Sequence, residues 1–265
     1  MQSLGAASII FTSAILLNIE ITWDILWVIY LLFYSFYLYN RFKEIDIDYP
    51  TNPERTKHLK TYIRQMPIIF IAVISILMAS LIYFSNLKAI LLTLLLLFFG
   101  LLYTDIFKKF TKKIPLFKNF YIASFFPLSV IFLPVYYSYS VSILIMGGAM
   151  FMMFVFLKAL MMQLLLDFKD AETDKKAGLR TLSVIWEEEK LFYFLKALTL
   201  LTALPIIIAL YFGIFPLFST LLFLTIPFNF YCFYLARKKN YTAYILAGGE
   251  FLLWSILISI GKAII

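Results

Sequence analysis

The sequence predicts an all-α protein that crosses a lipid bilayer many times. Hydrophobic residues make up 63% of the 265 residues and charged residues only 14%, which is too apolar for a water-soluble domain. Apolar stretches long enough to cross a hydrocarbon core of about 30 Å recur along the chain, and the polar segments between them are short. The strict alternation of membrane barrel strands is absent, so helices must satisfy the backbone in lipid.

We predict nine transmembrane helices that form a single domain over residues 1–265, arranged as a bundle around a central cavity that opens toward the cytoplasmic side. The first is short, and Pro50 and Pro53 stop any continuation of the second. Each of the others is an apolar run between short polar segments. The predicted helices lie near residues 4–19, 23–43, 62–85, 87–105, 119–138, 140–166, 190–212, 214–236 and 241–263.

Basic residues mark alternate helix boundaries. Clusters of Lys and Arg follow the second, fourth, sixth and eighth predicted helices, and only Lys88, Lys158 and Lys262 fall elsewhere. The positive-inside rule makes these loops cytoplasmic, with the N-terminus inside and the C-terminus outside. The net charge of +8 therefore reflects membrane topology, and we expect neither a nucleic-acid partner nor an obligate protein partner.

Three of the few acidic residues stand together at the cytoplasmic end of the sixth predicted helix: Asp167, Asp170 and Asp174. At about 100° per residue, Asp167 and Asp174 project about 20° apart and Asp170 about 60° away. All three therefore share one helix face over two turns. We expect them to converge on one site.

A second polar cluster follows the second predicted helix, where Asn40, Glu44 and Asp48 are spaced four apart. Both clusters stand at the C-terminal ends of helices, whose partial negative charge attracts cations. Hard oxygen ligands suit Mg²⁺, which commonly bridges to substrate phosphates. An interfacial acidic patch explains one cluster alone about equally well, whereas two clusters at matched depth favour a metal site.

These clusters resemble the two motifs of the UbiA superfamily of intramembrane prenyltransferases. Members carry Asn-Asp-x-x-Asp-x-x-x-Asp after the second helix and Asp-x-x-x-Asp after the sixth. Asp170 and Asp174 match the second motif. The family-like continuation is Lys175-Lys176-Ala177-Gly178-Leu179-Arg180-Thr181-Leu182.

The first motif is matched with two changes. Asn40 and Asp48 are kept, while Arg41 stands where Asp is usual and Glu44 replaces another Asp. Residues 112–119 are also similar to the basic loop that the family carries between its fourth and fifth helices.

The resemblance implies a prenyltransferase that transfers an isoprenyl group from an isoprenyl diphosphate to a lipophilic or aromatic acceptor, with Mg²⁺ helping diphosphate to leave. The residues it implies for catalysis are Asn40, Glu44, Asp170 and Asp174. One metal ion would be held by Asn40, Glu44 and Asp48, and another by Asp167, Asp170 and Asp174. Arg41, Lys112 and Lys113 would contact diphosphate oxygens, although each also serves as a positive-inside determinant.

The substrate pocket is expected to be apolar and partly aromatic. Aromatic residues make up 19% of the chain, and some of them would face the cavity and stabilise a carbocation. Tyr103 resembles a family position near the site, and Tyr39 is a second candidate. Lys158 and Glu250 lie at matched depth in the membrane, which favours a structural ion pair over a role for Lys158 in acceptor binding.

Two alternatives stay open on the sequence. A membrane terpene cyclase of the same superfamily would quench the cation within its own isoprenyl chain and would need no second substrate. A carrier or transporter that binds a lipid diphosphate would release no diphosphate, but no inverted repeat of the transporter kind is evident.

Overall fold

A computed structural model describes residues 2–45, 49, 53–139 and 145–264 of the chain. Their regular structure is entirely helical, which confirms the predicted all-α class for the part of the chain described. The helices in chain order are α1 (Gln2–Leu16), α2 (Trp23–Lys43), α3 (Pro53–Thr61), α4 (Met66–Phe84), α5 (Leu87–Asp105), η1 (Phe107–Lys112), α6 (Phe117–Tyr136), α7 (Gly147–Lys176), α8 (Leu182–Ile185), α9 (Glu188–Leu201), α10 (Ala203–Tyr211), η3 (Leu217–Leu224), α11 (Thr225–Arg237) and α12 (Thr242–Ile264).

Eight of the described helical segments are long and apolar enough to cross a bilayer. Two of them are composite, because α9 continues into α10 and η3 into α11. The helix α1 is shorter, since its 15 residues span only about 22 Å. The nine predicted helices therefore correspond, over the described residues, to eight long spans and one short apolar helix.

One boundary departs from the sequence prediction in a way that affects the site. The predicted sixth helix ended at residue 166, but α7 continues to Lys176. No Pro or Gly interrupts residues 149–176, so nothing in the sequence stops the helix earlier. The acidic residues of this region therefore lie on the helix itself.

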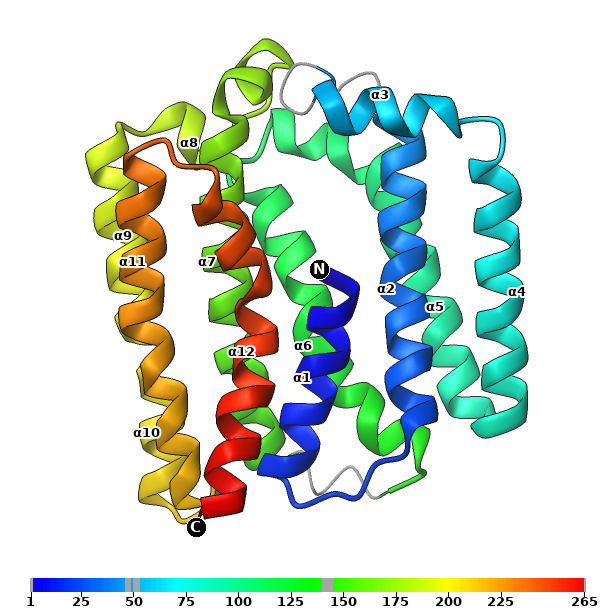
Figure 1. The fold of residues 1–265 in the computed structure, drawn as a ribbon, viewed down its shortest axis with the longest axis vertical. Helices are drawn as coiled ribbons and strands as arrows, with labels where there is room; N and C mark the ends of the chain where they lie inside the picture. Colours follow the sequence, from blue (N-terminus) through cyan, green and yellow to red (C-terminus); the bar gives the residue numbers. More distant parts are fainter. Residues whose placement is uncertain (1, 46–48, 50–52, 140–144, 265) are drawn as a thin grey trace.

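Figure 1 shows α1 between α2 and α12, with α6 behind it. The helices α4 and α5 flank α2 on one side, and α9, α10 and α11 lie on the other side beyond α12. The C-terminal ends of α2 and α7 lie at the same end of the bundle as α3 and α8 (Figure 1). At this end the Arg180 N–H donates to the Thr111 carbonyl at 3.1 Å, which ties the segment after α7 to η1.

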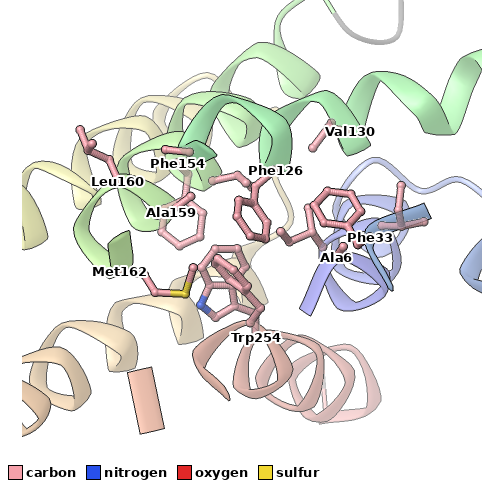
Figure 2. Packing of buried hydrophobic residues seen from close by; sticks show 14 of the residues in the cluster. Ala6, Phe33, Phe126, Val130, Phe154, Ala159, Leu160, Met162 and Trp254 are labelled. Atoms are coloured by element: carbon pink, nitrogen blue, oxygen red, sulfur yellow. The ribbon is translucent and has the colours of Figure 1, made fainter. Parts of the chain in front are cut away.

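Aromatic side chains fill the core where α1, α2, α6, α7 and α12 meet. The ring of Phe126 lies 5.4 Å from that of Phe33 and 5.2 Å from that of Phe251, between ring centroids. The rings of Phe154 and Trp254 are 4.8 Å apart, and Figure 2 shows this packing. In lipid there is no hydrophobic driving force between helices, so close packing of this kind is what holds them together.

A buried ion pair crosses from α7 to α12. Lys158 Nζ lies 2.8 Å from Glu250 Oε1, with the two side chains 0% and 2% exposed. Trp254 Nε1 donates to the same carboxylate oxygen at 3.4 Å. This geometry confirms the structural pair expected from the matched depth of the two charges.

Candidate functional site

A cavity of about 240 Å³ lies at the end of the bundle where α2 and α7 end. Its lining residues recur three or four apart on α2, α6 and α7, so each helix turns one face toward it. The polar and charged lining residues are Gln2, Asn40, Arg41, Glu44, Thr104, Lys118, Gln163, Asp167, Asp170, Thr173 and Asp174.

The acidic face of α7 is graded from buried to accessible. Asp167, Asp170 and Asp174 all line the cavity, so the predicted shared face is present. The side chain of Asp167 is only 3% exposed and that of Asp174 only 9%, whereas that of Asp170 is 32% exposed. A ligand entering the cavity would therefore meet Asp170 as the most accessible of the three.

One oxygen of Asp174 is suited to a cation. Asp174 Oδ2 is buried and has no hydrogen-bond partner among the described residues. The Lys118 ammonium is 3.7 Å from it, beyond hydrogen-bond distance. A buried carboxylate oxygen without a hydrogen bond is costly, and coordination to a cation would remove this cost.

Gly178 fixes the position of Asp174 through the end of α7. Gly178 adopts the left-handed conformation with φ of +69°. The Leu179 N–H donates to the Asp174 carbonyl at 2.9 Å, and the Gly178 N–H donates to the Lys175 carbonyl at 3.1 Å. These are the paired bonds of a Schellman cap, which turns the chain back so that Leu179 also lines the cavity.

The end of α2 supplies the opposite wall. Asn40, Arg41 and Glu44 line the cavity there. The Thr104 hydroxyl of α5 donates to Asn40 Oδ1 at 3.2 Å, and the Arg41 guanidinium lies 5.2 Å from the ring centroid of Tyr37. The two predicted polar clusters thus face one cavity, except that Asp48 lies outside the described residues.

Lys118 and Asn119 of α6 hold the carboxylate of Asp167. Lys118 Nζ lies 2.6 Å from Asp167 Oδ1, and Asn119 Nδ2 donates to Asp167 Oδ2 at 2.8 Å. The Ser183 hydroxyl donates to the Asp167 carbonyl at 3.0 Å. Both carboxylate oxygens of Asp167 therefore have protein donors.

Aromatic rings form the rest of the wall. The rings of Tyr103 and Tyr121 are 5.2 Å apart, those of Tyr121 and Phe125 are 5.4 Å apart, and those of Phe125 and Phe36 are 5.6 Å apart. All four residues line the cavity. The predicted site residue Tyr103 is thus beside the acidic residues, in a continuous aromatic wall.

Four of the predicted site residues that the structure describes are not among the side chains that line this cavity. Lys112 and Lys113 are exposed at the end of η1. The Tyr39 hydroxyl donates to Asp105, and the Tyr39 ring packs on Phe70 at 5.7 Å, which places it toward α4 and α5. Lys158 pairs with Glu250.

The lining residues for which the sequence predicted no role in the site include two with polar side chains, Lys118 and Gln163. From the sequence, Lys118 was interpreted as one of the basic residues that mark topology and as part of the segment 112–119 that resembles the family's basic loop, with no role in the site. Gln163, four residues before Asp167 on the same face, is 5% exposed, and its Nε2 has no hydrogen-bond partner among the described residues. Its helical spacing from Asp167 and Asp170 was the available signal.

The donor set fits Mg²⁺ that is shared with a phosphate group. Among the residues described, no three His, Cys, Asp or Glu side chains lie close enough to cage a metal ion. Mg²⁺ usually needs only one or two carboxylates, with water and substrate phosphate oxygens completing its shell. Asp174 Oδ2, which is buried and accepts no hydrogen bond from the described residues, and the accessible Asp170 are donors of this kind.

Comparisons with known proteins identify the family and agree with the fold. Residues 3–256 match the UbiA prenyltransferase family. Searching the curated proteins found no match. Three solved structures are similar in fold.

One is the apo structure of a UbiA homologue from Aeropyrum pernix K1, with a TM-score of 0.74 and 15% identity over 99% of this chain and 97% of that one. Another is a UbiA homologue from Archaeoglobus fulgidus bound to GPP and Mg²⁺, with a TM-score of 0.68 and 17% identity over 99% and 94%. A digeranylgeranylglyceryl phosphate synthase has a TM-score of 0.58 and 17% identity over 97% and 91%.

Proposed function

Because this chain belongs to the UbiA prenyltransferase family, we propose that it transfers an isoprenyl group from an isoprenyl diphosphate to a lipophilic or aromatic acceptor and releases diphosphate. The reaction would depend on Mg²⁺ and take place at the cavity between α2 and α7. The observation that carries this proposal is the convergence of Asp170 and Asp174 with Glu44 on one cavity that also has an aromatic wall. The GPP and Mg²⁺ bound to the Archaeoglobus fulgidus homologue support the donor class.

The described residues that would hold Mg²⁺ are Asn40 and Glu44 at the end of α2, and Asp170 and Asp174 on α7. Asp48 stays a predicted ligand. When bound, Mg²⁺ would offset the negative charge that develops on the departing diphosphate. Arg41 lines the same cavity and would donate hydrogen bonds to diphosphate oxygens, while Lys112 and Lys113 remain predictions for that role.

The aromatic wall suits the isoprenyl half of the donor. As the allylic C–O bond breaks, its electron pair leaves with diphosphate and a cation forms on the allylic carbon. The faces of Phe36, Phe125 and Tyr121 would stabilise this charge, and their apolar surface keeps water from capturing it. An electron pair of the acceptor would then form the new bond to carbon, and the acceptor would lose a proton.

We propose the cytoplasmic side for the cavity mouth, with the N-terminus on the same side. The clustering of Lys and Arg in the loops at this end supports that orientation. Labelling of single cysteines introduced at Lys57 and Lys88 in sealed vesicles, in a Cys232→Ser background, would test it. Only the first should be on the cytoplasmic face.

The test of the activity is diphosphate release from geranylgeranyl diphosphate by the purified protein in lipid, with and without Mg²⁺. The acceptor panel would contain a glycerol-based lipid phosphate, a naphthoquinone precursor and an aromatic acid. Asp170→Ala would be compared with Glu172→Ala, because Glu172 is an exposed acid on the same helix that does not line the cavity.

We expect release that needs Mg²⁺, Asp170 and one class of acceptor, and that Glu172→Ala leaves unchanged. Release without any acceptor would instead indicate the terpene cyclase. Binding of the donor with no release under any condition would indicate a lipid-diphosphate carrier and would refute the proposed transfer.

A further inference from the structure

Lys118 places a positive charge inside the acidic cluster of α7. Its ammonium lies 2.6 Å from Asp167 Oδ1 and 3.7 Å from Asp174 Oδ2. The side chain of Lys118 is 20% exposed and that of Asp167 only 3%. The position that a cation would occupy between these two carboxylates is therefore already taken by a side chain of the protein.

This arrangement is held at several points. Asn119, the next residue of α6, is fully buried and donates to the other oxygen of Asp167 at 2.8 Å. Ser183 holds the backbone carbonyl of Asp167 at 3.0 Å. Asp167 therefore has little freedom to turn either carboxylate oxygen toward another ligand without breaking a buried hydrogen bond.

Replacing the ammonium by a metal ion would be unfavourable here. A divalent ion at Asp167 would leave the Lys118 charge without its partner in a largely buried place, and separating one member of such a pair is costly. A metal ion bound to Asp167 and the Lys118 ammonium, which lies 2.6 Å from Asp167 Oδ1, would also repel each other strongly in a medium of low dielectric constant.

The described lining of the cavity carries a negative formal charge. Its described lining contains four acids, Glu44, Asp167, Asp170 and Asp174, and two bases, Arg41 and Lys118, which together give −2. This negative charge attracts a divalent cation to the cavity.

We propose that Lys118 takes the place of a second divalent cation, so that Asp167 positions Lys118 and the cavity binds one Mg²⁺ through Asp170 and Asp174. This inference rests on the proposed function for the identity of the metal and the diphosphate. It revises the role that the sequence suggested for Asp167, from metal ligand to positioning residue.

The experiment counts bound ions directly. Wild-type protein in lipid nanodiscs would be titrated with Mn²⁺ and free Mn²⁺ read by electron paramagnetic resonance. Each titration would include geranylgeranyl S-thiolodiphosphate, a donor analogue that resists cleavage. The variants are Asp167→Asn, Asp170→Asn, Lys118→Met and Lys118→Arg, with Glu172→Gln as the control for loss of an acid.

We expect one Mn²⁺ per chain for the wild type, Asp167→Asn, Lys118→Arg and Glu172→Gln. Asp170→Asn should weaken Mn²⁺ binding by about tenfold or more, because even groups that only support a metal ligand contribute about 10–100-fold to affinity. Lys118→Met should gain a second ion, because Asp167 and Asp174 lose their ammonium partner. If Lys118→Met does not fold, the comparison of Asp167→Asn with Asp170→Asn still decides the matter.

Two Mn²⁺ ions in the wild type would overturn the inference while leaving the proposed function intact, and loss of one of them in Asp167→Asn would make Asp167 a metal ligand. A wild type that binds neither Mn²⁺ nor the analogue would overturn both.

Discussion

Lys158 and Glu250 form an ion pair with 2.8 Å between Nζ and Oε1, and both are buried where α7 meets α12. Two further groups contact the pair: Trp254 Nε1 donates to the carboxylate at 3.4 Å, and Asn229 Oδ1 lies 3.5 Å from the ammonium. Because the pair is not part of the cavity lining, we interpret it as a structural link between two helices.

Removing one member of this pair should destabilise the protein more than removing both. Lys158→Met leaves a buried carboxylate without its counter-charge, at a cost of about 3–5 kcal/mol. The double variant Lys158→Met/Glu250→Gln should recover most of that loss. Thermal unfolding in detergent would measure the stability of both variants. A double variant that is as unstable as Lys158→Met, or less stable, would refute a direct pairing.

The sequence predicted the fold well because long apolar runs in a bilayer have few alternatives to helix. The sequence also predicted that Asn40, Glu44, Asp170 and Asp174 lie at one site. Helical spacing places residues on a common face whatever the helix packs against. The roles of Lys118 and Gln163 depend on which helix α7 packs against, and one sequence does not determine this. Tyr39 was placed beside Asn40 by number alone, yet neighbours on a helix point about 100° apart, and its hydroxyl reaches Asp105.

Asp170→Asn should reduce kcat by roughly 10²–10³-fold, because the loss of charge at the metal removes several kcal/mol of stabilisation from the departing diphosphate. Glu172→Gln should have no such effect, since Glu172 is exposed and does not line the cavity. Steady-state diphosphate release at saturating Mg²⁺ would compare them. A similar loss in both variants would point to the net charge of the helix end and not to a ligand role.

Gln163→Leu should raise the KM for the acceptor by about tenfold, because the loss of one hydrogen bond to a buried group weakens binding by about that factor. The amide nitrogen of Gln163 has no partner among the described residues and the side chain lines the cavity, so a carbonyl or hydroxyl oxygen of the acceptor would satisfy it. Met162→Leu is the matched control, because Met162 is buried on the same turn and does not line the cavity. An unchanged acceptor KM with a raised donor KM would assign Gln163 to the donor.

Gly178→Ala and Gly213→Ala should destabilise the protein alike but affect activity differently. Both glycines have positive φ, +69° and +65°, and open space around the missing Cβ, so each substitution costs about 1–2 kcal/mol of backbone strain alone. Only Gly178 belongs to the cap that holds Asp174 and Leu179, so only Gly178→Ala should weaken Mg²⁺ binding. Gly178→Asn should recover much of both losses, since Asn tolerates this conformation. Unfolding temperatures would measure the loss of stability, and Mn²⁺ titrations the loss of metal binding. Weaker Mn²⁺ binding in Gly213→Ala would argue that metal binding falls with overall stability and not through the cap at Gly178.

Gly100→Ala should narrow the cavity through the ring of Phe36. A Cβ at position 100 would collide with three ring carbons of Phe36, and both residues line the cavity. The ring must move, and overpacking of this kind typically costs about 1–3 kcal/mol. We expect a raised KM for geranylgeranyl diphosphate with a smaller effect on a geranyl donor, because a longer chain needs more of the cavity.

Gly248→Ala serves as the control, since nothing lies within 4 Å of its missing Cβ. The double variant Gly100→Ala/Phe36→Leu should restore the KM by returning the lost space. Failure of that restoration, with the protein still folded, would show that the effect of Gly100→Ala does not act through Phe36.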